Sequence, residues 1–447
     1  MSTDELAIFG GTPVLSTEEH RTWPQVGDDE KAAVMRVLDR GVLSGGDAPE
    51  ARAFEREFAK HAGTKHALLT HSGTSALQVA VAAVGVKAGD EVVIPSYSFV
   101  ATALAVMNQG GIPRFVDVLE STGNMDPALL EDAITDRTRA IMPVHVHGCP
   151  ADMAEINAIA ERRGIPVIED AAQAHLATYQ GRPVGSLGAA AGFSMQSSKN
   201  LSAGEGGVFV TDDDALMETA NRARNFGQDI SLAGRDGYDP SRPLDGDRPL
   251  VSLFPGHMFR GNEMMAAFAR VQLQKLPERT AAAQENAARL GAVLAELPGL
   301  EPPHVAPDRQ SAFHKYRVRF DARAAGVDLP NRALRAALKD ALCAEGVNAV
   351  LWQDHSLPEH PLVSRFEGFG GGWPFTASSS ADALRGSYAS DNFPRTRALL
   401  DSSIVLFSQT RPLIAQTPEV VDRYALALAK VWSQRERLVE VARRNAS

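Results

Sequence analysis

The sequence is poor in cysteine, in basic charge and in long apolar runs, and each shortage excludes a class of protein. Two cysteines, Cys149 and Cys343, cannot build a disulfide framework and are typical of a reducing cytoplasm. Forty-five Lys and Arg against 55 Asp and Glu give a net charge of −10, which would repel a nucleic-acid backbone. The longest nearly apolar run, about Ala76 to Val86, is too short to cross a bilayer, and residues 1–11 lack a signal-peptide pattern. We therefore expect a cytoplasmic protein with no nucleic-acid or membrane partner.

What the chain does have is an ordinary globular composition and a long α/β pattern. Of its residues, 44% are hydrophobic and 22% are charged, which is typical of a globular protein. A length of 447 residues is enough for two or three domains. Between residues 62 and 211, short β-like runs alternate with helical patterns, and several runs are apolar throughout. This pattern predicts an α/β domain whose mainly parallel sheet is covered by helices on both faces. The expected strands are His66–Thr70, Glu91–Pro95, Ile112–Val116, Ala140–Val146, Ile165–Ile168, Ala191–Met195 and Gly207–Val210; the expected helices are Ser75–Val86, Ser98–Gln109, Asp126–Ala133 and Pro150–Arg163.

The remainder of the chain predicts a smaller α+β domain after a polar loop. Asp229–Pro249 is rich in Gly, Pro and Asp, and Phe369–Asp391 is expected as a second long loop. The expected division is an N-terminal arm (1–25), a large α/β domain (26–280) and a small C-terminal domain (281–447). The expected helices and strand of this part are Asn262–Leu276, Glu278–Leu297, Lys315–Phe320, Arg332–Glu345 and Pro418–Arg443.

Three motifs carry candidate chemistry, and each has an ordinary structural alternative. Ser72-Gly73-Thr74-Ser75 follows a strand and opens a helix, where free N–H groups attract phosphate, although Ser and Thr are also common helix caps. Asp170 ends an apolar strand, where a carboxylate can pair with a cationic ring nitrogen, bind a metal or cap a helix. Lys199 follows Phe193-Ser194-Met195-Gln196 in a loop of small residues, where burial against a cofactor would lower its pKa and make it nucleophilic.

Together the three motifs supply a phosphate cradle, a ring-nitrogen carboxylate and an amine nucleophile. Pyridoxal phosphate (PLP) requires all three groups. Asp170 and Lys199 follow candidate strands of one sheet, and ligands of such sheets bind at the carboxyl ends of the strands. The joint occurrence of these motifs in this order predicts a PLP site.

The sequence resembles the DegT/DnrJ/StrS-type aminotransferases of sugar and cyclitol biosynthesis over nearly its whole length. The resemblance rests on the three motifs above and on Gly89-Asp90-Glu91-Val92-Val93-Ile94-Pro95, Pro143-Val144-His145, Ala151-Asp152-Met153, Glu169-Asp170-Ala171-Ala172-Gln173-Ala174-His175 and Gly204-Glu205-Gly206-Gly207. It implies the PLP aminotransferase fold of the aspartate aminotransferase type, with a large mainly parallel-sheet domain and a smaller C-terminal α+β domain. It also implies a homodimer whose active sites lie at the subunit interface.

The resemblance assigns roles residue by residue. Lys199 matches the lysine that forms the Schiff base and moves the proton, and Asp170 matches the carboxylate on the pyridine nitrogen. The remaining matches are Gln173 near the phenolic oxygen, Phe99 as the ring-stacking aromatic with Tyr97 as the alternative, and Ser72, Gly73, Thr74 and Ser194 around the phosphate. Arg260 matches an arginine that reaches the phosphate from the partner subunit.

One stretch departs from the family pattern. The family has Gly-x-Asn-x-Arg, whereas this chain has Gly256-His257-Met258-Phe259-Arg260, so Met258 replaces the expected asparagine. We therefore expect part of the inter-subunit phosphate contact to differ from that of the family, while Arg260 and dimerisation are retained.

Two histidine segments have other interpretations. His145-Val146-His147-Gly148-Cys149 suggests a metal site, but alternate residues converge poorly, so these side chains are expected beside the cofactor or in the core. His175 is expected either to contact the ligand or to have a structural role.

The expected activity is transfer of an amino group from glutamine or glutamate to a keto-cyclitol. Trp23-Pro24-Gln25, Phe193-Ser194-Met195-Gln196 and Trp352-Gln353-Asp354-His355 look most like the cyclitol branch, which aminates scyllo-inosose-type ketones in aminoglycoside-like pathways. A nucleotide-linked keto-sugar is the alternative acceptor. A dehydratase resembling 3-amino-5-hydroxybenzoate synthase and a PLP-binding regulator without turnover are further alternatives. The two loops named above are candidate acceptor determinants.

Overall fold

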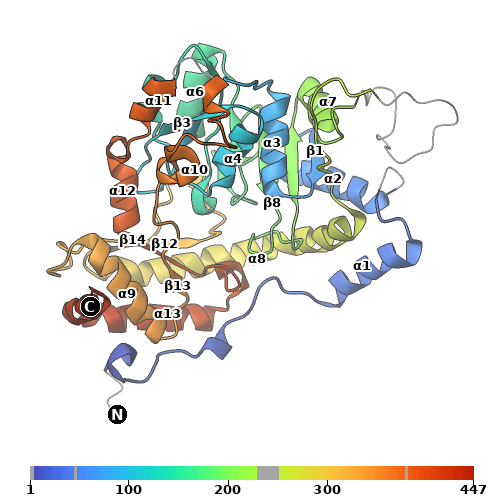
Figure 1. Ribbon diagram of the computed structural model, residues 1–447. Coiled ribbons are helices and arrows are strands. Elements are labelled where there is room, and N and C mark those ends of the chain that lie inside the picture. The colour runs from blue at the N-terminus through green and yellow to red at the C-terminus, as the bar shows by residue number, and fades with distance from the viewer. Residues whose placement is uncertain (1–4, 45–47, 229–250, 378–380, 447) are drawn as a thin grey trace.

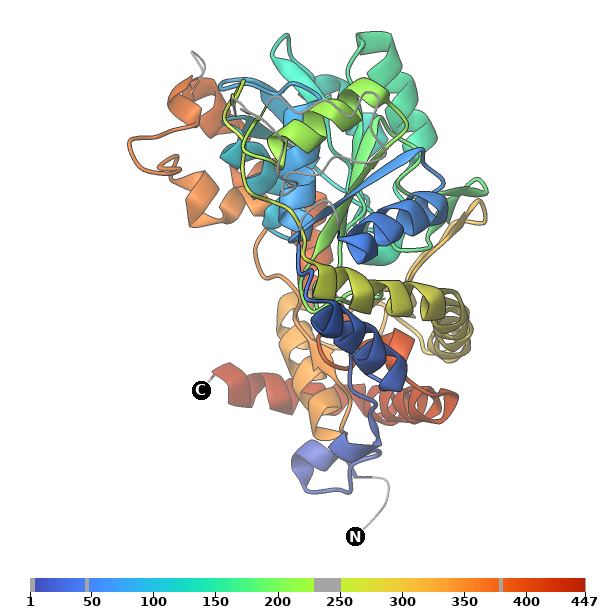
Figure 2. The same cartoon turned by 90° about the vertical axis from the view of Figure 1, so that its right-hand side faces the viewer.

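The computed structural model describes residues 5–44, 48–228, 251–377 and 381–446, and the expected loop Asp229–Pro249 lies outside them. An α/β body forms the upper part of the view in Figure 1, and a smaller α+β body forms the lower part. The long helix α8 (Glu263–Ala295) runs between the two bodies, which Figure 2 shows from the side. In the parts of the chain that the structure describes, no helix is both long and apolar enough to span a membrane.

The upper body is built around a mainly parallel sheet, as predicted. Two sheets, β3-β2-β4 and β1-β9-β8-β5, are joined by the parallel bridges Ile141–Val167 and Val144–Asp170. β2 pairs in parallel with β3 and β4, and β5 pairs in parallel with β8, whereas β9 runs antiparallel to both of its neighbours. The strands are β1 (His66–Thr70), β2 (Glu91–Pro95), β3 (Ile112–Val116), β4 (Thr138–Ile141), β5 (Ile168–Asp170), β8 (Ala190–Ser194) and β9 (Gly207–Thr211).

Two central strands differ from their predicted limits. β4 ends at Ile141 rather than at Val146. Beyond it the chain makes only the isolated bridge of Val144 to Asp170, and a turn follows in which His147 adopts a positive φ of 56°. β5 begins at Ile168 rather than at Ile165, and Pro166, which has no N–H to donate to a ladder, precedes it. Apolar runs of both segments therefore extend beyond the regular strands.

Helices cover the sheet. α3 (Gly73–Ala83) is buried along almost its whole length, which explains why its sequence is apolar all round. It begins where the Ser72 hydroxyl accepts a hydrogen bond from the Ser75 N–H at 3.1 Å. The other helices of this part are α2 (Pro49–Ala62), α4 (Ala101–Asn108), α5 (Leu130–Ala133), α6 (Met153–Arg163) and α7 (Asp214–Ala223), whereas α1 (Asp28–Arg40) packs on α8.

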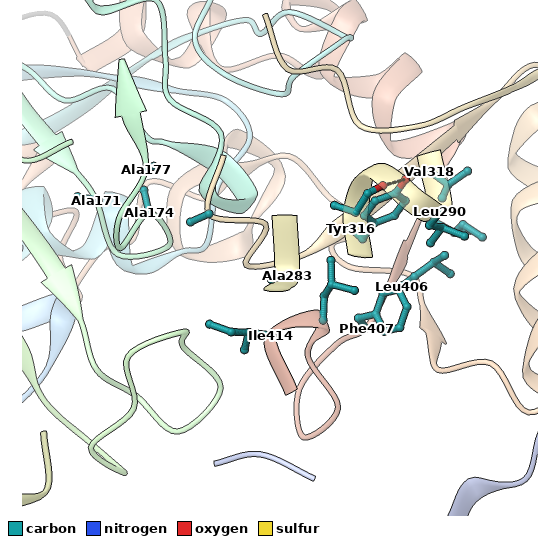
Figure 3. Packing of buried hydrophobic residues seen from close by; sticks show 14 of the residues in the cluster. Ala171, Ala174, Ala177, Ala283, Leu290, Tyr316, Val318, Leu406, Phe407 and Ile414 are labelled. Carbon is teal, nitrogen blue, oxygen red and sulfur yellow. Dashed lines mark hydrogen bonds between the residues drawn. The ribbon is translucent and has the colours of Figure 1, made fainter. Parts of the chain in front are cut away.

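The lower body contains a small antiparallel sheet, with order β10-β12-β14-β13. Tyr316 and Val318 of β12 pack with Leu406 and Phe407 against Leu290 of α8, as Figure 3 shows. The predicted helices Asn262–Leu276 and Glu278–Leu297 form one helix, α8, which continues through Pro277. The elements here are β10 (Leu300–Glu301), β12 (Tyr316–Phe320), β13 (Ala349–Val350), β14 (Ser403–Leu406), α9 (Asn331–Ala344), α12 (Pro394–Asp401), α13 (Pro418–Ser433) and α14 (Leu438–Ala446); the short strands β6 (Thr178–Tyr179), β7 (Arg182–Pro183) and β11 (Arg309–Gln310) pair separately.

The stretch Phe369–Asp391 is not the long loop that was predicted. It contains α11 (Ala381–Ser387), and α10 (Pro361–Ser364) precedes it. Tyr388 packs against Phe115 of β3 and donates a hydrogen bond to the Pro113 carbonyl. Phe375 and Tyr388 are buried in the core of the upper body, so the aromatic residues of this segment attach it there. Figure 1 accordingly shows α10 and α11 beside β3, away from α9 and α13. The domain limits at residues 25 and 280 stay a prediction, since α8 crosses the second limit without interruption.

Candidate active site

A cavity of about 330 Å³ lies where strands β5 and β8 end and α3 begins. Two groups of residues form its sides. The N-terminal wall consists of Ser72, Gly73, Thr74, Leu77, Ser98, Phe99, Ala101, Thr102, Asp170, Ala172, Gln173, Ser194, Gln196, Ser198, Lys199 and Glu205; the C-terminal wall consists of His314, Lys315, Trp352 and Gln409. Every predicted site residue except Arg260 therefore meets in one cavity.

The first turn of α3 forms a cradle for an anion. A Cβ atom on Gly73 would lie 2.5 Å from the Cβ of Ser194, so only glycine allows this approach. The backbone N–H groups in the first turn of α3 have no partner within the helix, and such groups bind phosphate. Thr74 and Ser194 add hydroxyl groups to the lining, whereas the Ser72 hydroxyl caps the helix.

Asp170 presents a buried carboxylate at the end of β5. Its side chain accepts hydrogen bonds from the Thr102 hydroxyl at 2.7 Å and from the Ala172 N–H at 3.2 Å. Burial raises the pKa of Asp170, and the hydrogen bond from Thr102 opposes that rise. Such a carboxylate gains stability from a cationic N–H partner, as a protonated pyridine ring would provide.

Lys199 presents an amine to the same cavity. Burial lowers the pKa of Lys199 to about 8, although the Asp170 carboxylate acts in the opposite direction. With this pKa about a tenth of the Lys199 amine is neutral at pH 7, and the neutral amine is the form that acts as a nucleophile. The backbone carbonyl of Lys199 accepts a hydrogen bond from the Trp23 indole at 2.9 Å, so the N-terminal arm contributes to the position of this loop.

Gln173 and the two candidate aromatic residues occupy distinct positions. The Gln173 side-chain oxygen accepts a hydrogen bond from the His147 N–H at 3.0 Å, which orients its amide at the cavity. Phe99 is 55% exposed and lines the cavity. Tyr97 is 2% exposed and packs behind the site against Trp352. Of the two aromatic residues, Phe99 has the position that suits ring stacking.

Arg260 does not line this cavity within the single chain. Its guanidinium donates to the Asn225 side chain at 2.7 Å, and it lines another pocket with Glu55 and Arg224. Met258 is 48% exposed on the same stretch. The role of Arg260 in a partner's site stays a prediction.

Two of the histidine candidates, His145 and His175, have structural partners, whereas in the described part of the chain neither ring nitrogen of the buried His147 has a hydrogen-bond partner. His145 contacts Glu169 at 3.0 Å, and its other ring nitrogen accepts from the Ala151 N–H at 3.0 Å. The His175 ring donates to the Ser194 carbonyl at 2.8 Å, and burial lowers the pKa of His175 to about 3. His175 is thus neutral and supports the strand end that carries Ser194.

Sequence reasoning missed Thr102 and, in the C-terminal wall, His314, Lys315 and Gln409, while Trp352 was named only for its resemblance to the cyclitol branch. Thr102 lies in the first turn of α4. Its hydroxyl reaches Asp170 only because the start of α4 meets the end of β5. Lys315 immediately precedes β12, where Arg317 and Arg319 alternate with apolar residues, and this strand pattern was the one available signal. None of the described residues of Phe369–Asp391 lines the cavity of its own chain. The expected role of this segment as an acceptor determinant therefore has no support from the cavity lining.

The arrangement is that of a fold-type I PLP-dependent aminotransferase. The matching family model is the DegT/DnrJ/EryC1/StrS aminotransferase family, which covers residues 24–365, and the chain belongs to this family. A Protein MosB from Rhizobium meliloti is 35% identical, over 94% of this chain and 79% of that protein. The dTDP-3-amino-3,4,6-trideoxy-alpha-D-glucose transaminase of Streptomyces venezuelae is 40% identical, over 65% of this chain and 72% of its own. The crystal structure of 3-amino-5-hydroxybenzoic acid synthase superposes with a TM-score of 0.77 at 29% identity, over 93% of this chain and 99% of that chain.

These similarities confirm the predicted family, fold class, enzyme class and cofactor. The residues of this chain also fit PLP on geometric grounds. A cradle that a Cβ would fill, a buried carboxylate and an amine of lowered pKa line one cavity. The protein is therefore a PLP-dependent aminotransferase of the sugar and cyclitol type.

Proposed function

We propose that the protein transfers an amino group from glutamine or glutamate to the ketone of a cyclitol such as scyllo-inosose, in aminoglycoside-like antibiotic biosynthesis. The lining of the cavity carries this proposal. Among the described residues that a single chain contributes to the lining, the cations are Lys199 and Lys315 and none is arginine, whereas the diphosphate of a nucleotide-linked sugar favours arginine. Trp352 offers an apolar face to a polyol ring, and Gln196, Ser198 and Gln409 offer partners to its hydroxyl groups.

Each site residue has a proposed role. PLP, when bound, supplies the electron sink that makes the α-proton of an amino acid removable. Lys199 attaches the cofactor through its amine and, once released, moves a proton to and from the substrate carbon. Asp170 keeps the ring nitrogen protonated, with Thr102 orienting its carboxylate.

The remaining cofactor residues hold and orient the ring. The start of α3 with Gly73, Thr74 and Ser194 binds the phosphate, while Ser72 caps this helix. Phe99 and Gln173 line the same cavity and would hold the ring, Phe99 through its aromatic face and Gln173 through its amide. We also propose a homodimer in which Arg260 reaches the partner's phosphate, with Met258 beside it.

A nucleotide-linked keto-sugar is the second candidate acceptor, and the name of the Streptomyces venezuelae transaminase favours it. The name of the superposed synthase, in turn, favours a dehydratase. A PLP-binding regulator would bind the same cofactor without turnover.

The test is an absorbance and product assay on the PLP-loaded protein. L-Glutamine and L-glutamate are added separately, and then scyllo-inosose or a dTDP-linked keto-sugar is supplied. We expect one donor to remove the yellow band and scyllo-inosose to be converted to its amine, detected by mass spectrometry. Amination of the dTDP-sugar alone would favour the second candidate, a dehydrated aromatic product would favour the synthase, and a band that no donor removes would favour a regulator. The Lys199→Ala variant is the control for turnover.

A further inference from the structure

Lys315 is a buried amine in the cavity to which no motif assigns a role. It immediately precedes β12, is 5% exposed and lines the C-terminal wall. Its ammonium donates to the Ser408 hydroxyl at 3.3 Å and lies 6.0 Å from the centre of the Trp352 ring. A hydroxyl group and an aromatic ring thus orient its side chain.

Within the described residues, no carboxylate lies within 4.0 Å of the Lys315 ammonium. The acidic residues of the lining are Asp170, which is bound to Thr102, and Glu205, which is exposed. Taking an ammonium ion out of water without an anionic partner is unfavourable. Burial, with the nearby positive charge of Lys199, lowers the pKa of Lys315 to about 7. An anion that enters the cavity would therefore stabilise the charged form of Lys315.

The position of Lys315 selects among the anions of the reaction. The cofactor phosphate is expected at the start of α3, which belongs to the N-terminal wall. Lys315 belongs to the C-terminal wall and is close enough to Lys199 for their charges to interact. A donor amino acid must bring its amine to the place of the Lys199 amine. Its α-carboxylate is attached to the carbon atom that carries this amine, so the carboxylate must also lie close to Lys199. A diphosphate on a sugar acceptor would be separated from the reacting ketone by several bonds.

We propose that Lys315, held by Ser408 and Trp352, binds the α-carboxylate of the amino-acid donor. This inference rests on the proposed function, because it requires an amino acid to enter the cavity. Lys315 is then a positioning and specificity residue: it accounts for the choice of an α-amino acid over a simple amine.

The test compares two donors that differ only by the α-carboxylate, L-glutamine and 4-aminobutanamide. Each is titrated into the PLP-loaded wild type and into Lys315→Met, and binding is followed by the change in the visible band. A charge-assisted hydrogen bond of about 1.5–3 kcal/mol predicts that Lys315→Met raises the half-saturating glutamine concentration by roughly ten- to a hundred-fold. The half-saturating concentration of 4-aminobutanamide should stay unchanged.

Two further variants control for charge and folding. Lys315→Arg retains the cation and should recover part of the glutamine affinity, while a normal yellow band in each variant shows an intact site. Lys60→Met removes one positive charge from an exposed position of α2 and should leave both titrations as in the wild type. Equal weakening of both donors in Lys315→Met, or weakening of neither, would overturn the proposal.

A non-reactive dicarboxylate separates this inference from the proposed function. Glutarate carries no amine, so its effect on the visible band reports carboxylate binding without any turnover. If no amino acid removes the band in the wild type, the proposed function fails. If glutarate perturbs the band of Lys315→Met at the same concentrations as that of the wild type, the assignment of Lys315 fails.

Discussion

The two walls of the cavity differ in how the chain builds them. The N-terminal wall comes from residues 72–205, and its chemical groups follow strands β1, β5 and β8 directly. The C-terminal wall comes from separate points of the lower part of the chain, at residues 314, 315, 352 and 409. Parallel strands bring their ends to one edge, so short motifs suffice for the first wall. The second wall depends on the packing of a different sheet, and we infer that it selects the substrate.

The largest expected effect separates the two lysines of the cavity. Lys199→Ala should lower turnover by at least about a thousand-fold, because a positioned acid–base group and the cofactor attachment are both lost. The shape of the visible spectrum should also change. Lys315→Ala should retain the normal yellow band, since it belongs to the other wall. Steady-state rates and spectra check this, and a normal band in Lys199→Ala would contradict the assignment of the N-terminal wall.

The second prediction concerns adjacent carboxylates on β5. Asp170→Asn should lower kcat by roughly a hundred-fold, because a neutral amide no longer holds the ring nitrogen protonated. Single-turnover kinetics with the donor would measure the loss.

Glu169→Gln is the matched control. The Glu169 carboxylate is buried and accepts hydrogen bonds from the backbone N–H groups of Gly185, Leu187 and Gly188. Its loss should lower the midpoint of urea unfolding and leave the rate per folded molecule near that of the wild type. If both variants lost activity equally, the distinction between catalytic and structural carboxylates would not hold.

The third prediction uses pH on the PLP-free protein. Burial lowers the pKa of Lys199 to about 8 and that of Lys315 to about 7, against 10.5 in the unfolded chain. Between about pH 7 and pH 10 the unfolded state therefore binds more protons, so these lysines make the free energy of unfolding rise with pH. The groups that face Lys315 are Lys199, Ser408, Trp352 and the neutral His147 and His314. Melting temperatures at pH 7 and pH 9 should rise less in Lys315→Met than in the wild type, and an equal rise would contradict the burial of this charge.

The smallest expected effect comes from the N-terminal arm. Trp23→Phe removes the indole N–H that donates to the Lys199 carbonyl, and a net loss of about 1 kcal/mol would lower kcat roughly five-fold. Trp432→Phe is the matched control, because it removes a hydrogen bond of similar length that the Trp432 indole donates to the Pro298 carbonyl in the lower body. Only the first substitution should change kcat. Equal effects would show that the arm acts through stability alone.

Particular elements show how far sequence reasoning reached. β1, β2 and β3 have their predicted limits, because polar or turn-forming residues flank each apolar run and mark where the strand begins and ends. The ends of β4 and β5 were misplaced, since apolar residues continue past the end of β4 into a buried turn and also precede the start of β5 around Pro166. The segment around Tyr388 was mistaken for a loop, because its Gly and Ser content concealed aromatic residues that pack against β3.

The site divides in the same way. The sequence by itself determined the PLP chemistry, since Gly73, Asp170 and Lys199 each lie next to the end of a strand in one sheet. Only the tertiary structure decided that Thr102 holds Asp170 and that Lys315 enters the same cavity as Lys199. The physical reason is that strand ends of one sheet meet whatever surrounds them, whereas contacts between the two bodies depend on how α8 and the small sheet pack.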